Sequence, residues 1–127
     1  MPERDTTTPG APCWVQLTSS DVTRSRDFYS RLFGWVAEEP SQEFGGYFTF
    51  TRDGVAIAGG MGAIPGEAPS DTWSVYLSTD DAGKTTELVA EHGGQVLVPP
   101  MTVGNLGTMA FYVDPGGAAI GAWQSEQ

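Results

Sequence analysis

Hydrophobic and polar positions alternate in several short segments of the chain and follow helical spacing in two others. The alternation in Cys13–Thr18 predicts a strand with Val15 and Leu17 on one face. A helix follows, with Ser20 or Asp21 as its N-cap and Gly34 placed to end it. Its apolar stripe consists of Val22, Phe28, Tyr29, Leu32 and Phe33. Two more strands, Tyr47–Thr51 and Val55–Ala58, are joined by the turn Arg52-Asp53-Gly54.

The second half of the chain repeats this order. Ser74–Thr79 is a predicted strand, and Asp80 or Asp81 caps a helix that is closed by Gly93-Gly94. The helical stripe consists of Ala82, Thr85, Leu88 and Val89. The three remaining strand candidates are Gln95–Val98, Thr108–Val113 and Ala118–Trp123. The Gly- and Pro-rich segment Gly59–Ser70 between the halves is predicted to be a linker.

The two halves also align residue by residue. Val15–Ser19 matches Val75–Thr79 at an offset of 60 (75 − 15), and Gly54–Ala58 matches Gly117–Gly121 at an offset of 63 (117 − 54). An internal repeat of a unit that cannot bury its own apolar face indicates that the units pair. The sequence therefore predicts an α+β fold, in which two βαβββ modules form a curved mixed sheet with helices on the convex side.

Composition narrows the possible functions. The chain has 127 residues, the size of one domain, and 6 Lys and Arg against 16 Asp and Glu, a net charge of −10. Such a surface repels phosphate backbones and anionic lipids, which disfavours nucleic acid and membrane as partners. No apolar run approaches the ~20 residues of a membrane span, and residues 1–11 have the composition of a flexible tail without a signal sequence. A cytoplasmic location is expected, since the single Cys cannot form an internal disulfide.

Two motifs resemble those of a known family. Asp21–Gly34 follows the pattern D-x-x-x-S-x-x-F-Y-x-x-x-x-G, and Asp114–Gly117 follows the pattern D-P-x-G. Both are similar to the vicinal oxygen chelate superfamily, which includes glyoxalase I, extradiol dioxygenases and bleomycin-resistance proteins, and the closest likeness is to a bacterial glyoxalase-like subgroup. The resemblance implies that residues 12–127 form a single glyoxalase-like domain, with modules 12–60 and 72–124.

The resemblance also implies four metal-ligand positions, one on the first and one on the last strand of each module. They fall on Trp14, Ala58, Ser74 and Gly121. An indole, a methyl group, a neutral hydroxyl and a glycine are unsuitable as ligands of a catalytic metal. The only His, His92, lies at the end of the second predicted helix. It is expected to interact with the last carbonyl groups of that helix and not to bind a metal. The expectation is a member of this family without the family metal and without another cofactor.

Strand alternation predicts what lines the concave face instead. If the four ligand positions face inward, Gln16, Ala56, Gly60, Tyr76 and Trp123 do so as well. Small residues on the last strands would leave room for a ligand. The predicted ligand-binding residues are Trp14, Gln16, Ser74, Tyr76, Met109 and Trp123. Packing of the two Trp side chains into the volume of the lost metal site is the alternative, and Cys13 is predicted to face the helix.

Three functions remain open at this point. The first is a protein that binds a small planar or aromatic molecule without metal. The second is a metal-independent tailoring, isomerase, lyase or hydroxylase-like enzyme on a keto or polyketide-type substrate, with Tyr76 beside Gln16 or Ser74. The third is a structural partner with a vestigial cleft. A homodimer is expected, because members of the family that the chain resembles often pair across a two-fold axis.

Overall fold

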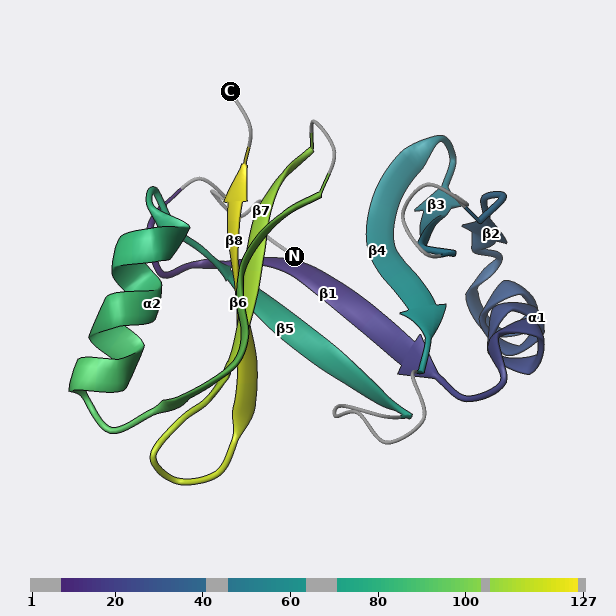
Figure 1. The fold of residues 1–127 in the computed structure, drawn as a ribbon. Coiled ribbons are helices and arrows are strands. Elements are labelled where there is room, and N and C mark those ends of the chain that lie inside the picture. Colours follow the sequence, from purple (N-terminus) through teal and green to yellow (C-terminus); the bar gives the residue numbers. More distant parts are fainter. Residues whose placement is uncertain (1–7, 41–45, 64–70, 104–105, 126–127) are drawn as a thin grey trace. The chain divides into compact units, whose positions relative to one another are not determined.

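The computed structural model describes residues 8–40, 46–63, 71–103 and 106–125 (Figure 1). Eight strands and two helices lie in this part of the chain. They are β1 (Pro12–Ser19), α1 (Val22–Phe33), β2 (Val36–Ala37), β3 (Phe48–Arg52), β4 (Val55–Gly62), β5 (Thr72–Ser78), α2 (Ala82–Glu91), β6 (Gln95–Val103), β7 (Gly107–Val113) and β8 (Ala119–Ser125). The element order is strand, helix and three strands, twice, as the repeat predicts.

The strands form a mixed sheet with the hydrogen-bonded order β2-β3-β4-β1-β5-β8-β7-β6. The chain divides into two compact units. The α1 unit is Val15–Ser74, and the α2 unit is Met1–Trp14 together with Val75–Gln127. Strands β1 and β5 each contribute residues to both units, and each unit is described by itself below.

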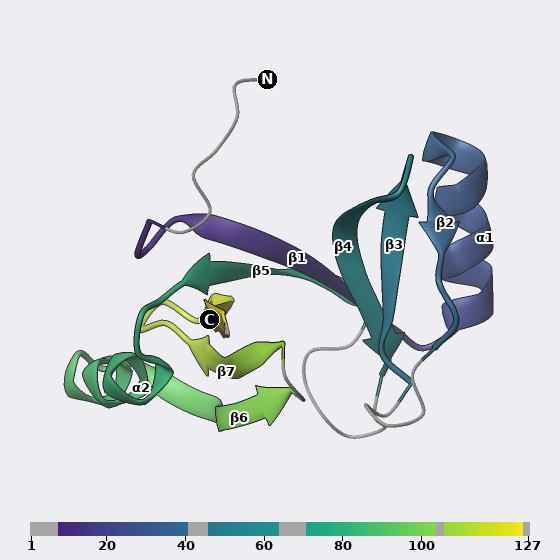
Figure 2. The same cartoon turned by 90° about the horizontal axis from the view of Figure 1, so that it is seen from above.

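The α1 unit is built around an aromatic core. Strand β1 runs parallel to β4, and β4 runs antiparallel to β3, so the last strand of the module returns beside the first. Helix α1 lies beside β2, β3 and β4 in Figure 2. The buried side chains of Phe48 and Phe50 meet edge to face, with ring centroids 5.1 Å apart. Around them, Trp73 Nε1 donates a hydrogen bond of 2.8 Å to the Tyr29 hydroxyl, which ties α1 to β5.

The α2 unit has a smaller core. Strand β5 runs parallel to β8, which pairs antiparallel with β7, and β7 pairs with β6. Helix α2 packs on one face of these strands through Val89, which contacts the buried cluster of Ala110, Tyr112 and Ala122. The hydroxyl groups of Tyr112 and Thr86 form a hydrogen bond of 2.7 Å, so the buried phenol has a hydrogen-bond partner on α2.

The start of each helix repeats at the level of single contacts. Asp21 caps α1 by accepting from Arg24 N at 3.2 Å, and Asp81 caps α2 by accepting from Lys84 N at 3.0 Å. A hydroxyl pair precedes each helix in the same way: Ser19 with Ser25 at 2.7 Å, and Thr79 with Thr85 at 2.6 Å. Each of these residues lies 60 positions from its counterpart, so the same contacts stabilise the N-terminus of both helices.

The cap of α2 provides a stability prediction. Asp81→Ala is expected to lower the free energy of unfolding by about 1 kcal/mol, because the Lys84 N–H loses its acceptor. Asp80→Ala is the matched control, since Asp80 is the neighbouring carboxylate and the structure gives the cap to Asp81. Urea unfolding followed by circular dichroism measures both variants. Equal losses in the two variants would contradict the assignment of the cap.

A β-bulge in β4 corrects the predicted faces of the first module. The register shifts between Phe50 and Thr51, so that Phe50 pairs with Ala58 and Thr51 with Ala56, leaving Ile57 as the extra residue. Ala58 is consequently buried in the core cluster with Leu17 and Phe50. The alternation that placed Ala58 and Gly60 on the face of Gln16 was therefore wrong.

The apolar stripe of α1 is only partly buried. Tyr29 and Val22 pack against the core, whereas Phe28 is 55% exposed and Leu32 is 53% exposed. Phe28 and Tyr29 are consecutive, and consecutive helical residues project about 100° apart, so both cannot point at one core. The predicted stripe therefore contains a core face and a second apolar face that the unit leaves open.

Three further expectations are resolved in part. Gly59–Gly62, predicted as the start of the linker, is the end of β4, and residues 64–70 lie outside the described part of the chain. Residues 1–7 of the predicted tail also lie outside it, while Gly10 and Ala11 exchange backbone hydrogen bonds with Ser78. His92 is the C-cap of α2, as predicted. Neither α1 nor α2 has the length and apolar character that crossing a membrane requires.

Candidate functional site

The face of the α2 unit opposite α2 carries a row of sulfur, indole and hydroxyl groups. Met101 pairs with Met109 across β6 and β7, Met109 pairs with Trp123 across β7 and β8, and Ser78 of β5 is level with Trp123. Side chains alternate along a strand, and Ala110 and Ala122 pack toward α2, so Met109 and Trp123 point to the other face. We call Ser78, Trp123, Met109 and Met101 the Met–Trp row.

A second aromatic row lies beside the first on the same face. Phe111 and Gly121 are cross-strand partners, and Gly121 is level with Tyr76 on β5. The rings of Tyr76 and Phe111 have centroids 5.9 Å apart, and both side chains are buried. The predicted grouping of Tyr76, Met109 and Trp123 on one face of the sheet is thus present.

The space expected above the small residues of this face is occupied. A Cβ atom at Gly121 would lie 2.4 Å from Cδ2 of Tyr76, so the phenol ring lies directly over this glycine. Gly107 is covered in the same manner, because a Cβ there would lie 2.7 Å from Cζ2 of Trp123. Glycine at these positions allows an aromatic side chain to lie flat on the sheet, and the expectation of open room at Gly121 was wrong.

The two rows differ in accessibility. Tyr76 is 4% exposed, whereas Met101 is 50% exposed and the side chains of Met109 and Trp123 are half-buried. Of the predicted residues in this unit, Trp14, Met109 and Trp123 are therefore partly accessible, and Tyr76 lies beneath the surface. Trp14, the fourth predicted residue of the α2 unit, is half-buried on β1.

The remaining two predicted residues belong to the α1 unit. Gln16 Nε2 donates to the sulfur of Met61 at 3.3 Å, so both side chains lie on the face of β1 and β4 opposite the aromatic core. Ser74 is 6% exposed. The β4 bulge reverses the alternation after Ile57, so Met61 lies on the face of Gln16, which explains why strand alternation alone missed Met61.

Cys13 lies beside the site without the features of a reactive thiol. Its sulfur donates to the backbone oxygen of Tyr76 at 3.5 Å. Burial raises the pKa of the Cys13 thiol, which disfavours the nucleophilic thiolate at neutral pH. The chemistry of this face is therefore that of uncharged aromatic, thioether and hydroxyl groups.

The residues at the family's metal-ligand positions do not fit a metal. Ala58 is buried against Phe50 on the α1 side of β4, and the glycine at 121 lies under the Tyr76 ring. An indole at position 14 and a neutral hydroxyl at position 74 do not replace carboxylate or imidazole ligands. Among the described residues, no group of three His, Cys, Asp or Glu side chains is placed to hold a metal ion.

Comparison with known proteins identifies the class. Residues 13–121 match the model of the Glyoxalase/Bleomycin resistance protein/Dioxygenase superfamily. The chain belongs to this superfamily, and its paired βαβββ modules agree with that assignment.

Two curated relatives are about twice as long as this chain. It is similar to the anthracycline biosynthesis protein DnrV of Streptomyces peucetius, with 42% identity over 91% of this chain and 47% of the relative. It is also similar to the putative glyoxylase CFP32 of Mycobacterium tuberculosis, with 36% identity over 100% of this chain and 50% of the relative. The chain thus spans about half the length of these proteins.

Solved structures support the fold. A methylmalonyl-CoA epimerase of Streptomyces coelicolor is similar with a TM-score of 0.64 at 16% identity, covering 94% of this chain and 100% of that chain. A superfamily member from Vibrio splendidus is similar with a TM-score of 0.56 at 15% identity, covering 88% of this chain and 97% of that chain. At these identities the likeness concerns the fold alone.

Proposed function

We propose that this chain binds a small, planar, aromatic molecule on the Met–Trp row of the α2 unit, without the family metal. The observation that carries the proposal is the accessible alignment of Met101, Met109 and Trp123 across three neighbouring strands. An indole offers a flat apolar surface to a fused ring system, and methionine adapts its shape to varied ligands. The Ser78 hydroxyl at the end of the row supplies one neutral hydrogen-bonding group.

The character of the row restricts the ligand class. Two thioethers, an indole and a hydroxyl carry no charge, and the chain as a whole has a net charge of −10. An anionic ligand would be repelled at long range and would find no cation in the row. We therefore propose an uncharged polycyclic ligand of the polyketide type, which agrees with the description of the relative DnrV as an anthracycline biosynthesis protein.

Trp123→Ala tests the proposal. The variant is expected to bind a neutral probe, 1,8-dihydroxyanthraquinone, at least tenfold more weakly than the unaltered chain, because the stacking surface is lost. A tenfold loss corresponds to about 1.4 kcal/mol of binding free energy. Isothermal titration calorimetry is the suitable measurement, since it does not depend on the fluorescence of the Trp that is removed.

Trp35→Phe is the matched control, because Trp35 packs with Tyr29 in the core of the α1 unit. It removes an indole from the chain and leaves the Met–Trp row unaltered, so the affinity should not change. Circular dichroism establishes that both variants are folded. Equal affinity of Trp123→Ala and the unaltered chain would exclude this row as the site.

The alternative function is a metal-independent enzyme acting on a keto or polyketide-type substrate. The buried phenol of Tyr76 lies in the row beside Trp123 on the same face, and this placement favours Tyr76 as its polar centre. Tyr76→Phe separates the two functions, because binding on the Met–Trp row survives loss of the hydroxyl whereas proton transfer by the phenol does not. A variant that binds the anthraquinone and turns over a keto substrate at the normal rate would exclude catalysis by Tyr76.

A further inference from the structure

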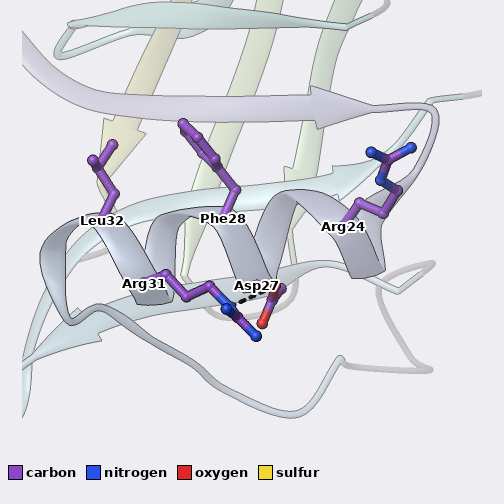
Figure 3. Close-up of a pocket in the computed structure, with 5 residues that line it drawn as sticks. All are labelled: Arg24, Asp27, Phe28, Arg31 and Leu32. Carbon is purple, nitrogen blue, oxygen red and sulfur yellow. Dashed lines mark ion pairs between the residues drawn. The ribbon is translucent and has the colours of Figure 1, made fainter.

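Helix α1 presents an open face of mixed apolar and basic side chains. The surface around Arg24, Asp27, Phe28, Arg31 and Leu32 is hollowed. Figure 3 shows Arg24, Phe28 and Leu32 projecting from one side of the helix, with the ion pair of Arg31 and Asp27 beside them. Phe28 is 55% exposed and Leu32 is 53% exposed. We call these five residues the α1 face.

The α1 face points away from the core of its unit. Tyr29 and Val22 pack against that core and lie about 20° apart around the helix axis, because successive residues are rotated by about 100°. Phe28 lies about 100° from Tyr29 around the same axis, and Arg24 and Arg31 lie about 140° and 160° from it. The α1 face is therefore a second stripe of the helix, which the core of the unit does not cover.

The charge of helix α1 contrasts with that of the whole chain. The helix carries Arg24, Arg26 and Arg31, which are three of the six basic residues of the sequence, and one acidic residue, Asp27. It therefore contributes +2 to the net charge of −10, and the rest of the sequence carries −12. Arg26 is engaged within the unit, with its Cζ atom 5.2 Å from the centroid of the Phe48 ring. The two other arginines belong to the α1 face.

The guanidinium groups of the α1 face are available to carboxylates from outside. Arg31 Nε lies 3.0 Å from Asp27 Oδ2, and these two side chains are 81% and 62% exposed. An ion pair so exposed is worth little, so Arg31 can exchange Asp27 for another carboxylate at little cost. Among the described residues, no ion pair involves Arg24. Guanidinium groups bind carboxylates through two parallel hydrogen bonds, which makes them suited to an acidic partner.

We propose that the α1 face binds an acidic amphipathic helix of a different protein. Phe28 and Leu32 lie one turn apart and form a ridge for apolar side chains of the same spacing on the partner. Arg24 and Arg31 are seven residues apart, which is two turns or about 10 Å along the axis. Two carboxylates with this separation on the partner helix would pair with both guanidinium groups while its apolar side chains cover Phe28 and Leu32.

Charge favours this occupant over three others. A nucleic acid or an anionic lipid surface is extended, so it would also meet the −12 carried by the rest of the sequence. A second copy that pairs across a two-fold axis at this face would bring the arginines of both helices together. A single partner helix meets the local charge of Arg24 and Arg31, because charges beyond about 8 Å are screened at physiological ionic strength. The acidic surface elsewhere repels the same helix, which restricts it to the α1 face.

Isothermal titration calorimetry of the full chain with two designed peptides tests the proposal. The acidic peptide is an alanine-rich helix of about 20 residues, with two leucines one turn apart between two glutamates that are two turns apart. The basic peptide carries lysine in place of each glutamate. The unaltered chain is expected to bind the acidic peptide at least tenfold more tightly than the basic one. Phe28→Ala should weaken binding of the acidic peptide at least tenfold, because the ridge loses its larger side chain.

The double variant Arg24→Glu/Arg31→Glu should reverse the preference and bind the basic peptide at least tenfold more tightly than the acidic one. Loss of folding cannot produce such a reversal, and circular dichroism establishes that each variant is folded. Arg52→Glu is the matched control, because Arg52 is exposed at the end of β3 and lies outside the α1 face. It makes the same charge change and should leave the preference of the unaltered chain intact.

Several results would overturn the proposal. They are equal affinity of the unaltered chain for both peptides, no reversal in the double variant, and a loss in Arg52→Glu as large as that in Phe28→Ala. Sedimentation velocity of the same variants distinguishes a second copy as the occupant. If Phe28→Ala changes the oligomeric state of the chain, the α1 face binds this chain itself and not a different protein. The α1 face contains no residue of the Met–Trp row, so these results are independent of the proposed ligand site.

Discussion

Replacing Phe50 with alanine is expected to lower the free energy of unfolding by about 3–5 kcal/mol, the range found when a fully buried aromatic side chain is removed. Phe50 is 0% exposed, and its ring contacts those of Phe48, Tyr29, Trp35 and Trp73. Removal leaves a cavity that these large rings cannot readily fill. Against a total stability of about 5–15 kcal/mol for a domain, the loss is severe. Urea unfolding followed by circular dichroism measures it.

Phe33→Ala is the control for Phe50→Ala, because it removes the same side chain from a position that is 48% exposed. The loss should be about 1 kcal/mol, since less apolar surface returns to water and no closed cavity forms. If the two variants lose similar stability, the aromatic cluster is not the core of the α1 unit.

Gly60→Ala is expected to destabilise the chain by about 1–3 kcal/mol, the usual cost of overpacking a core. A Cβ atom at this position would lie 2.4 Å from Cζ of Phe48, and Phe48 is itself only 2% exposed. The rigid ring can yield only by displacing its neighbours. Thermal and urea unfolding of the purified variant measure the effect.

Gly62→Ala is a control for Gly60→Ala within the same strand. A Cβ at Gly62 would meet Cγ2 of Val22 at 3.7 Å, an ordinary van der Waals contact. Its expected effect is neutral or a small gain, because alanine restricts the unfolded chain more than glycine does. A neutral Gly60→Ala variant would mean that Phe48 does not lie over this glycine.

The same arrangement of an aromatic ring over a glycine explains why the candidate site could not be deduced from residue size. Gly60 lies under Phe48, Gly121 under Tyr76 and Gly107 under Trp123. In each case the glycine leaves room for an aromatic side chain of the adjacent strand, which fills the space above it. Volume at a sheet face depends on which side chains the register brings together, and that register is a long-range property.

Local features were predictable because their physical causes lie within a few residues. Asp21 and Asp81 cap their helices through N–H groups three residues ahead, and Gly34 ends α1 with a positive φ of 72°. The alternation in β5 and β8 placed Tyr76 and Trp123 on one face, and the structure has them there. In β4 the same reasoning failed, since the bulge at Ile57 depends on pairing with Phe50 and Thr51 of another strand.

The sequence by itself determined the repeated strand–helix–strand order, the helix boundaries, the superfamily and the unsuitability of Trp14, Ala58, Ser74 and Gly121 as metal ligands. These follow from periodicity, caps and donor chemistry, which act locally. Only the tertiary structure decided that Ala58 is buried in the α1 core, that Tyr76 covers Gly121, and that Phe28 and Leu32 remain exposed. These depend on strand register and on which face of a helix meets the sheet. Such contacts join residues far apart in the chain, so local patterns do not specify them.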